Sequence, residues 1–401
     1  LANWYINNTI SNTADSTISA SLGRNANNAS LPVDVASGTT LLISGPLVNI
    51  IGANGLAKSG AGTLRLSGTN TFTGNTTINA GTLEISGAGQ LGSGSYAGTI
   101  ANNNTFVFNS SSAQTLGGII SGAGALVKGS SGSLALSAKS THTGGTTVNG
   151  GTLILGAGGN VGTIRGALTV NAGATVASAV TNSTGILVPV SPLNINGGTV
   201  GLSFGQHHIW ASTVNMVGGT LKFSSTIDNE QFNAVYNVSN STSQAQILSP
   251  GGGAMRMRDS VASPCMTFNV ADGSQAVDLL VDVRIIVGTG VGGLTKNGAG
   301  TIEFTKANTY NGPTAINAGR VFINGTGSGN SAHTVEIGAT LAGTGTVLGA
   351  TTVNGIVAPG SIASPTGTLN IANNVTWNGA SDNAVTTRDW YFDLGPNNTS
   401  D

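Results

Sequence analysis

The chain has 401 residues, of which 62 are glycine and only 7% are Asp, Glu, Lys or Arg, and its formal net charge is −1. An ordinary soluble domain is about 25% charged, and a nucleic-acid-binding surface needs clustered Lys and Arg. The composition therefore argues against a helical protein and against a nucleic-acid partner. Hydrophobic residues make up 39% of the chain, which is enough for a core and argues against disorder.

The length of the chain favours a repeat array or several domains, because a single hydrophobic core rarely grows beyond about 250–300 residues. No run of apolar residues approaches the roughly 18 that a membrane-spanning helix needs. The single cysteine, Cys265, excludes an intramolecular disulfide. The chain begins at Leu1 and ends at Asp401 without an initiator methionine or a signal peptide. We therefore expect residues 1–401 to be part of a longer precursor.

Three long repeats occupy Gly55–Ile85, Ala125–Leu155 and Gly293–Ile323, and they align without a gap. The aligned positions share a leucine, a lysine and two glycines. In the order of the three repeats, these residues are Leu56, Leu126 and Leu294; Lys58, Lys128 and Lys296; Gly62, Gly132 and Gly300; and Gly81, Gly151 and Gly319. Repeats of this kind predict a solenoid in which each unit stacks on its neighbours.

The repeats contain short strands in which apolar and polar residues alternate. In Thr63-Leu64-Arg65-Leu66 the leucines point one way, into a core, while Thr63 and Arg65 point to water. Equivalent strand starts recur at a near-constant distance along the chain, as Thr63 and Thr82 do, and again Thr334 and Thr352. These spacings predict a solenoid with coils of roughly 20 residues, each built from three short strands and three turns. About 20 such coils, about 4.8 Å apart, would form a rod on the order of 100 Å long.

The predicted turns share a short motif: a β-branched residue, then Asn, then Ala or Gly, then Gly. Asn and Gly tolerate the left-handed backbone region that tight turns require. Asparagines at the same place in successive coils can also hydrogen-bond to one another, as in stacked amide ladders. The asparagines of the full motif are Asn79, Asn149, Asn171, Asn196 and Asn317.

Two segments interrupt the pattern, and residues 333–401 form its C-terminal end. Residues 225–262 are the best candidate for a loop or insertion, and residues 177–192, with Pro189 and Pro192, are a lesser one. Loops on a solenoid commonly carry the binding function. Apart from these segments, we expect 1–401 to be one continuous β-helix.

The repeats resemble the autotransporter-associated β-strand repeat of bacterial surface proteins. The match is carried by Leu56–Leu64, Thr69–Gly74 and Ile78–Leu83 and by their counterparts in the other two copies. The end of such arrays is resembled by four C-terminal segments: Leu341–Val347, Val357–Gly360, Gly367–Ile371 and Trp390–Phe392. The second copy departs from the pattern at Ser140 and His142. The resemblance implies a secreted passenger region, a right-handed parallel β-helix and a cell-surface role, and it implies no catalytic residues.

Several residues could form chemical sites but are better interpreted as structural. Lys58 with Gly60-Ala61-Gly62 lacks the spacing of a phosphate-binding loop. The neighbours His207 and His208 would point to opposite faces of a strand and could not easily chelate one metal ion. We expect the isolated His142 and His333 to be ordinary surface or core residues.

Three further features carry a structural interpretation as well. Cys265 is expected to be a small buried hydrophobe, and Met255-Arg256-Met257-Arg258, with Asp259, a solvated loop. Asp278, Asp282 and Arg284 would share one strand face near Asp272, as a polysaccharide-cleaving enzyme would need. A solvated strand edge is the simpler explanation, so no catalytic, cofactor-binding or metal-binding residues are predicted.

The sequence thus favours an extracellular structural or adhesive repeat module, displayed on or released from a bacterial surface, with glycans or surface proteins as partners. One alternative is a filament subunit that stacks end to end, because the end coils of a β-helix have unpaired backbone groups. Another is a polysaccharide-cleaving enzyme or a toxin passenger, which rests on analogy of fold alone.

Overall fold

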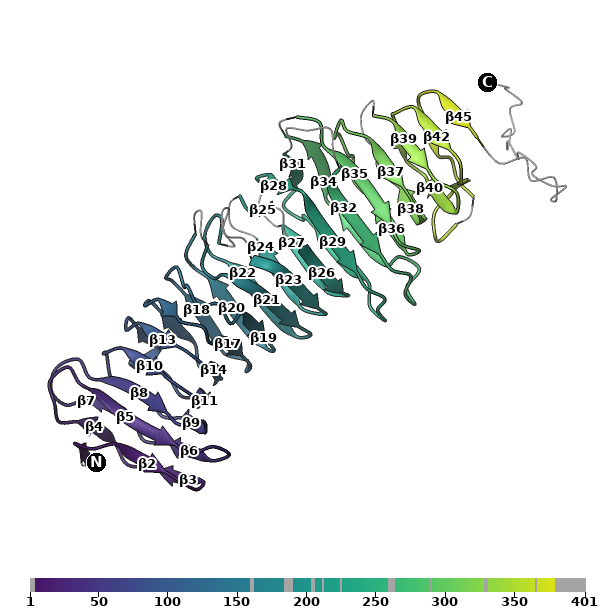
Figure 1. The fold of residues 1–401 in the computed structure, drawn as a ribbon. Coiled ribbons are helices and arrows are strands. Elements are labelled where there is room, and N and C mark those ends of the chain that lie inside the picture. The colour runs from purple at the N-terminus through teal and green to yellow at the C-terminus, as the bar shows by residue number, and fades with distance from the viewer. Residues whose placement is uncertain are drawn as a thin grey trace.

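The protein is an elongated rod with its N-terminus at one end (Figure 1). The computed structural model describes residues 4–158, 162–183, 190–202, 206–210, 213–223, 226–258, 264–288, 290–327, 331–364 and 366–378. Within these ranges there are 45 short strands and one 3-10 turn, Gly92–Gly94. Every strand pairing is parallel, so the chain winds as a parallel β-helix. It makes about 15 turns of about 23 residues.

Strands of the same face stack into a central sheet that runs the length of the rod. In pairing order they are β3 (Ser16–Ile18), β6 (Thr40–Ile43), β9 (Thr63–Leu66), β11 (Thr82–Gly87), β14 (Thr105–Ser110), β17 (Ala125–Lys128), β19 (Thr146–Val148), β21 (Gly166–Asn171), β23 (Val190–Asn196), β26 (Thr213–Val217), β29 (Ala234–Val238), β32 (Pro264–Val270), β35 (Gly293–Asn297), β37 (Thr314–Ile316), β39 (His333–Val335), β42 (Thr351–Val353) and β45 (Val375–Trp377).

A second face follows the central sheet in each coil. It begins with β1 (Trp4–Ile6), β4 (Leu22–Arg24) and β7 (Leu47–Asn49), and it continues as a 13-stranded sheet of β12 (Ser95–Tyr96), β15 (Gln114–Leu116), β18 (Ser133–Leu136), β20 (Gly151–Leu155), β22 (Ala174–Ser178), β24 (Thr199–Leu202), β27 (Thr220–Phe223), β30 (Ala245–Leu248), β33 (Leu279–Asp282), β36 (Thr301–Phe304), β38 (Gly319–Ile323), β40 (Ala339–Gly343) and β43 (Ile356–Pro359).

The third face is discontinuous. Near the N-terminus it holds β2 (Ile10–Asn12), β5 (Ser30–Val35), β8 (Gly55–Ser59), β10 (Thr76–Ile78), β13 (Ile100–Asn102) and β16 (Ile120–Ser121), and near the C-terminus β41 (Thr346–Val347) and β44 (Asn370–Ile371). Between them lies a four-stranded lateral sheet of β25 (His208–Trp210), β28 (Asn229–Phe232), β31 (Ala254–Met257) and β34 (Arg284–Val287).

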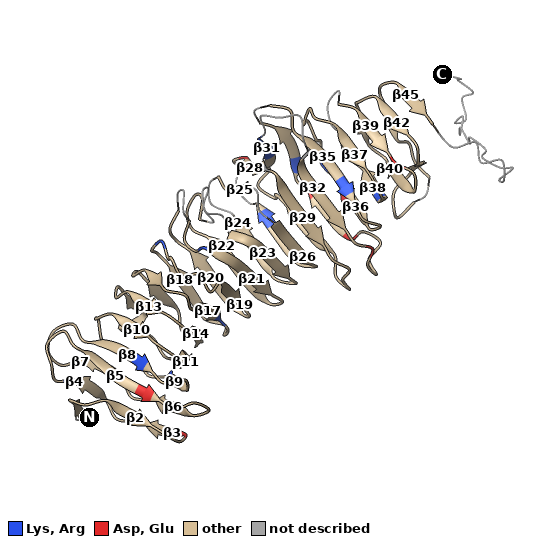
Figure 2. Ribbon diagram, in the orientation of Figure 1, with Lys and Arg blue, Asp and Glu red and all other residues tan. Residues whose placement is uncertain are grey.

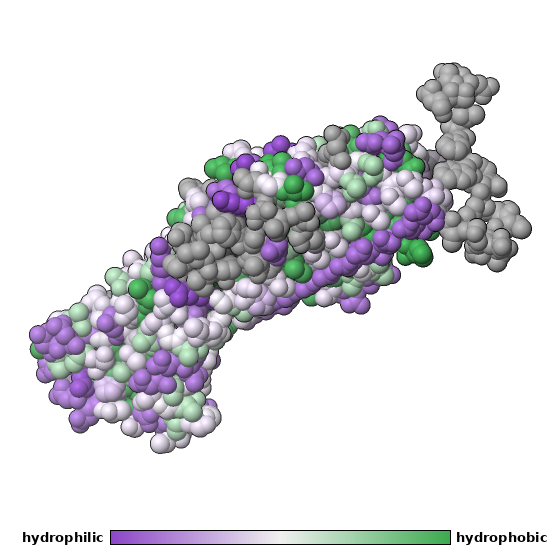
Figure 3. All heavy atoms as spheres, turned by 45° about the horizontal axis from the view of Figure 1, so that its top comes forward, coloured by the Kyte–Doolittle hydropathy of each residue, from purple (hydrophilic) through white to green (hydrophobic). Residues whose placement is uncertain are grey.

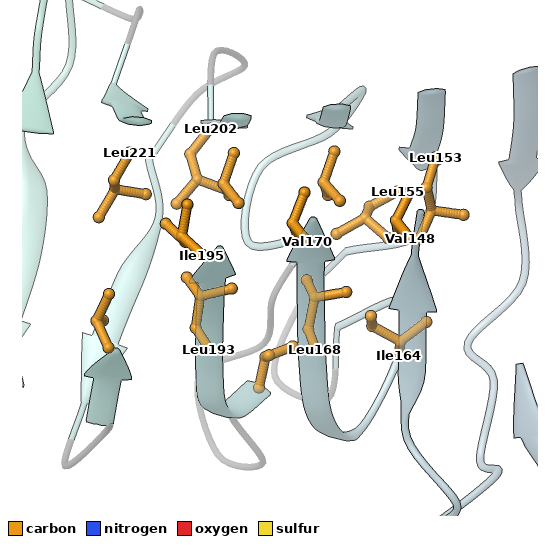
Figure 4. Packing of buried hydrophobic residues seen from close by; sticks show 14 of the residues in the cluster. Val148, Leu153, Leu155, Ile164, Leu168, Val170, Leu193, Ile195, Leu202 and Leu221 are labelled. Atoms are coloured by element: carbon orange, nitrogen blue, oxygen red, sulfur yellow. The ribbon is translucent and has the colours of Figure 1, made fainter. Parts of the chain in front are cut away.

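The interior of the coils is one continuous stack of Leu, Ile, Val and Phe. Leu64 and Leu66 are fully buried, whereas Thr63 and Arg65 are only partly buried, as the alternation predicts. Figure 4 shows how Leu168 and Val170 pack against Leu193 and Ile195 of the next coil. Because each coil covers the apolar side of its neighbour, every additional coil buries more apolar surface without making the core wider.

The coils are longer on average than the sequence spacing predicts. Within the third repeat the prediction is right, because Leu294 pairs with Thr314 and Thr314 with His333, and these pairings enclose coils of the predicted length. Before it, Ala234 pairs with Met266 and Met266 with Leu294, and these two coils are much longer than those of the repeats. About 15 turns rather than 20 give a stack on the order of 70 Å at about 4.8 Å per coil, and the expected 100 Å is too long.

The lateral sheet accounts for the longest coils. Within its described residues, the expected loop or insertion 225–262 contributes four strands, β28, β29, β30 and β31, which pair in parallel with strands of the coils on either side. Part of the candidate segment 177–192, including Pro189, and the end of the stretch 333–401, including Trp390, lie outside the described residues.

The three long repeats do not all occupy the same faces. The lysine strand of the first repeat, β8, lies on the third face, whereas β17 and β35 of the other two repeats lie in the central sheet. The first repeat is therefore turned by one face relative to the second and third. The repeat is thus a local two-coil unit that can start on different faces of the helix.

Candidate functional site

Each repeat contains a lysine that is completely buried, and its ammonium group bonds to backbone carbonyls of two successive turns. Lys296 Nζ donates to the carbonyl oxygens of Asn297 at 2.9 Å, Gly298 at 2.7 Å and Ala318 at 3.1 Å. The first two carbonyls belong to the turn that follows the lysine, and the third belongs to the turn of the next coil. One side chain thus ties two coils together.

The other two lysines make the same kind of contact. Lys58 Nζ donates to the carbonyls of Ser59, Gly60 and Ala80, and Lys128 Nζ to those of Ser130 and Gly150. Burial lowers the pKa of Lys58 and lowers the pKa of Lys128 and of Lys296 to about 8. These last two values remain above neutral pH, so the ammonium keeps the three donors that the carbonyls require.

The glycine that closes each repeat's turn allows the two coils to approach. Gly319 has a φ of +68°, and a Cβ placed there would lie 2.5 Å from the carbonyl oxygens of Gly298 and Gly300. Gly81 and Gly151 have φ values of +65° and +63° and equally close neighbours. Only glycine combines this backbone conformation with so little space. In the segment Gly60-Ala61-Gly62, the Gly60 carbonyl accepts from Lys58 and the Gly62 carbonyl accepts from the Thr82 N–H of the next coil, so this segment serves coil stacking.

A buried polar side chain at a second turn also crosses between coils. The Asn70 Oδ1 accepts the backbone N–H of Leu47 at 2.9 Å, and its Nδ2 donates to the carbonyls of Gly68 and Gln90, each at 2.9 Å. In the second repeat Ser140 accepts only from the N–H of Ile120, at 3.3 Å. Asn308 of the third repeat accepts from Ile285 at 2.9 Å. The Ser140 side chain thus makes fewer hydrogen bonds at this turn than the Asn70 side chain does in the first repeat.

In all three repeats the hydroxyl of a threonine on the adjoining strand hydrogen-bonds to the side chain of a buried Tyr or His. Thr314 Oγ1 lies 2.6 Å from Tyr310 Oη, Thr146 Oγ1 lies 3.0 Å from His142 Nε2, and Thr76 Oγ1 lies 2.8 Å from Oη of Tyr96, which comes from the next coil. A cavity beside Tyr310 measures about 10 Å³, which is room for about one water molecule. These contacts stabilise the stack, and the cavity beside Tyr310 is too small for a substrate.

The outer side of the central sheet carries a column of hydrogen-bonded asparagines, which we call the asparagine rail. Each Nδ2 donates to the Oδ1 of the asparagine one coil earlier, at 2.8 to 2.9 Å, and the first donates to Thr169 Oγ1 at 3.2 Å. The rail consists of Asn194, Asn215, Asn237, Asn269, Asn297 and Asn317.

A shorter ladder beside the rail joins Asn149, Asn171 and Asn196, with Nδ2 to Oδ1 distances of 2.6 and 3.1 Å. Asparagine ladders are therefore confirmed for these three motif positions. Asn317 belongs to the rail instead, because the two columns occupy different register positions on their strands.

The face around the rail carries no charge. Among the described residues, no outward-facing side chain on β14 through β42 of the central sheet is Asp, Glu, Lys or Arg, and β19, β21, β23, β26 and β29 are entirely tan in Figure 2. Apolar and polar residues are interspersed over the side of the rod seen in Figure 3. The lateral sheet differs, because Arg258 forms an ion pair of 2.6 Å with Glu230 there and Arg256 and Arg284 lie on neighbouring strands.

Comparison with known proteins explains the repeated unit. Residues 56–85, 126–155 and 294–321 match the passenger-associated-transport-repeat family. These three segments are similar to passenger-associated transport repeats, and we call them passenger repeats. The chain is 29% identical over 322 residues to the adhesin BmaC autotransporter of Brucella suis biovar 1 (strain 1330), an alignment that covers 78% of this chain and 8% of that protein. No solved structure matches.

Passenger repeats of this kind belong to secreted or surface-displayed proteins, and that is the location of this chain. The described residues contain no helix with the length and apolar character needed to cross a membrane. The chain spans less than a tenth of the length of the adhesin that it matches.

The histidines lie in and around the passenger repeats. His207 is buried, and the side chain of His208 lies outside the described residues. His142 and His333 are buried, and burial lowers the pKa of both, that of His333 to about 4. Within the described part of the chain, no three His, Cys, Asp or Glu residues gather closely enough to hold a metal ion.

The charged residues considered for polysaccharide cleavage do not lie together on one face. Both carboxylate oxygens of Asp278 accept backbone N–H groups, from Gly273 and Thr301, each at 2.8 Å. Asp282 pairs with Lys306 at 3.0 Å, and Asp272 lies exposed in the preceding turn. Arg284 is on the lateral sheet and not on the strand of Asp282, so the expected shared face is wrong.

The remaining two predicted features have different outcomes. The Cys265 thiol is buried and donates to the Gln231 carbonyl at 3.3 Å, which suits an inert core residue. The stretch Met255 to Arg258 is not the solvated loop that its charges suggest. Met255 to Met257 lie on β31, with both methionines fully buried and Arg256 turned outward, and the exposed Arg258 follows the strand. Asp259 lies outside the described residues. The period-two alternation of Met and Arg was the signal for this strand.

The residues that sequence reasoning missed are the buried lysines. Lys58 has the same parity as the buried Leu56 in its strand, so the alternation itself places it inside. The general rule that lysines stay outside argues the other way. The carbonyl-lined turn that receives the ammonium group becomes visible only in three dimensions.

Proposed function

We propose that this chain is the adhesive part of a longer surface protein, a non-catalytic rod that holds binding faces away from the cell. The observation that carries the proposal is its similarity, over 78% of its length, to a protein named as an adhesin. The passenger repeats supply the stiffness, because each one fastens two coils through a buried lysine. The long uncharged face supplies a surface for contact.

An enzymatic role has less support. The carboxylate of Asp278 is occupied by two backbone amides, and a general acid or base must be able to reach the proton that it transfers. If the chain nevertheless released products from candidate polysaccharides, and lost that activity in an Asp278→Ala variant, the non-catalytic part of the proposal would be wrong.

Adhesion can be tested directly with the purified chain coupled to beads. We expect the beads to be retained on host cells, or on a panel of glycans and matrix proteins, above the level of beads coated with an inert globular protein. A chain in which the three buried lysines are replaced by methionine is a useful comparison, because it alters the stiffness but leaves the outer face unchanged. Retention no better than that of the inert protein on every surface would overturn the proposal.

A further inference from the structure

We propose that the asparagine rail is the adhesive surface itself and that it binds a neutral polysaccharide along the axis of the rod. This inference rests on the proposed adhesive function and names its ligand class. Three features carry it: the unused hydrogen-bonding capacity of the rail, its fixed spacing and its lack of charge.

The ladder satisfies only half of each amide. An asparagine side chain has two N–H donors and two acceptor lone pairs on its oxygen. Each interior rung, such as Asn237, donates once to the rung before it and accepts once from the rung after it. One N–H and one lone pair therefore remain on each partly buried rung. They form a row of donor–acceptor pairs that suits hydroxyl groups, which both donate and accept.

The rungs are held in place before any ligand arrives. Both neighbours of an interior rung restrain its amide, and the backbone register is continuous from Asn194 through Asn297. Ordering a side chain on binding costs free energy, and here much of that ordering precedes binding. The rungs repeat at about 4.8 Å, so six of them span roughly 24 Å. A ligand with regularly repeated groups gains most from such a row.

The chemistry of the surroundings favours a neutral sugar polymer over a protein. The residues that flank the rail, including Thr213, Val235, Thr267 and Thr295, are partly buried and uncharged. Protein interfaces depend on buried Trp, Tyr and Arg anchors, and the described outward positions of the central-sheet strands β23, β26, β29, β32, β35 and β37 contain none of these. Individually weak hydrogen bonds to successive sugars would add through multivalency.

We expect an acidic polymer to bind to the lateral sheet instead of the rail. Arg256 and Arg284 of the lateral sheet offer positive charge, although Arg258 is already paired with Glu230. Binding there would weaken as salt is added. Binding on the rail should change little, because neither partner carries a charge.

The test uses the whole chain and a series of neutral glucan oligosaccharides of increasing length, with heparin as an acidic comparison, in titration calorimetry. We expect affinity to rise with oligosaccharide length until the ligand spans about 24 Å and then to level off. Replacing Asn215, Asn237 and Asn269 together by Val should weaken binding of the long glucans at least about tenfold. Asn103→Val, at an exposed turn elsewhere, should leave it unchanged within about twofold.

The length series requires only the native chain, so it decides the matter even if the triple variant fails to fold. Three results would contradict binding of a neutral polysaccharide by the rail. These are a short sugar that binds as tightly as a long one, a preference for heparin that salt removes, and full binding by a folded triple variant. If the native chain adheres to cells or matrix proteins but fails these tests, adhesion stands and the rail is wrong. If the native chain binds no surface at all, both proposals fail.

Discussion

At the scale of single residues, the buried lysines are the contacts whose loss the structure makes easiest to predict. In Lys296→Met, a side chain of similar length stays in the core, but the carbonyls of Asn297, Gly298 and Ala318 lose their donor. A buried polar group left unsatisfied costs about 1–3 kcal/mol. Because a solenoid opens locally, hydrogen exchange of the third repeat should speed up accordingly, while the first repeat stays unchanged.

The matched control is Lys222→Met. Lys222 lies on β27 with its side chain partly exposed, so its loss leaves no carbonyl group uncovered in the core. Exchange near Lys222 should hardly change. Equal effects of the two substitutions would show that the carbonyl contacts of Lys296 contribute nothing to stability.

His333 makes the rod sensitive to acid at a defined place. Burial lowers its pKa to about 4 in the folded protein, below its ordinary value of 6.5, so between these values the unfolded chain binds more protons than the folded one. Stability is therefore lost as the pH falls from about 6.5 towards 4. His333→Thr places in this column the residue found in the coils on either side, Thr314 and Thr351.

The measurement for His333 is hydrogen exchange of β37, β39 and β42 at several pH values. The native chain should lose protection in these strands between pH 6.5 and 4, and the variant should lose less over the same interval. His142 has a pKa shifted in the same direction and remains in both proteins, so the coils around it should respond to acid equally. A variant as acid-sensitive as the native chain in β39 would remove His333 as the cause.

At the scale of structural elements, the second repeat offers a substitution that should stabilise. In Ser140→Asn, the new amide can copy Asn70, with its oxygen on the Ile120 N–H and its nitrogen directed at the carbonyls of Ala138 and Thr163. Ser140 already donates its own backbone N–H to the Thr163 carbonyl at 2.9 Å, so the turns superpose at this point. Two added hydrogen bonds are worth about 1 kcal/mol or more.

Slower hydrogen exchange at Ile120 and Thr141 would confirm the gain in Ser140→Asn. The reciprocal change Asn308→Ser should speed exchange at Ile285, whose N–H is bonded to the Asn308 side chain. No change in either variant would mean that this turn does not limit the opening of the coils.

The sequence predicts a strand and its register well where both strands of a pair lie in the sequence repeats. The strands Thr63–Leu66 and Thr82–Gly87 follow from alternation, and the spacing between them in the sequence is the observed register. The lateral sheet could not be predicted, because its strands pair only with one another across the longest coils, which share no repeat. Met255 and Met257 showed the correct period, but the arginines between them favoured a loop.

For the candidate binding surface, the sequence predicts that asparagine ladders form but not which asparagines make up the rail. The turn motif indicates asparagine ladders, and Asn149, Asn171 and Asn196 form one. The longer rail runs mainly through asparagines outside the motif, such as Asn215 and Asn237, and Asn317 is its one member from the full motif. These residues meet because coils of very different length return to the same register, which sequence spacing alone cannot show.

At the scale of the whole molecule, the number of coils sets the length of the rod, and that length can be measured. About 15 turns at about 4.8 Å predict a described stack of roughly 70 Å. Electron microscopy of the purified chain over a concentration series should show separate rods close to that length. Compact particles, or rods nearer to about 100 Å, would contradict the stacking described here.

The same images test the alternative of end-to-end assembly. The terminal coils of a β-helix offer unpaired strand edges, and such edges associate unless something covers them. Fibres that grow with concentration and repeat along their axis at the rod length would make self-assembly the function to pursue. Rods that stay separate at high concentration would remove that alternative and leave the sides of the rod, where the asparagine rail lies, as the surface through which this protein makes contact.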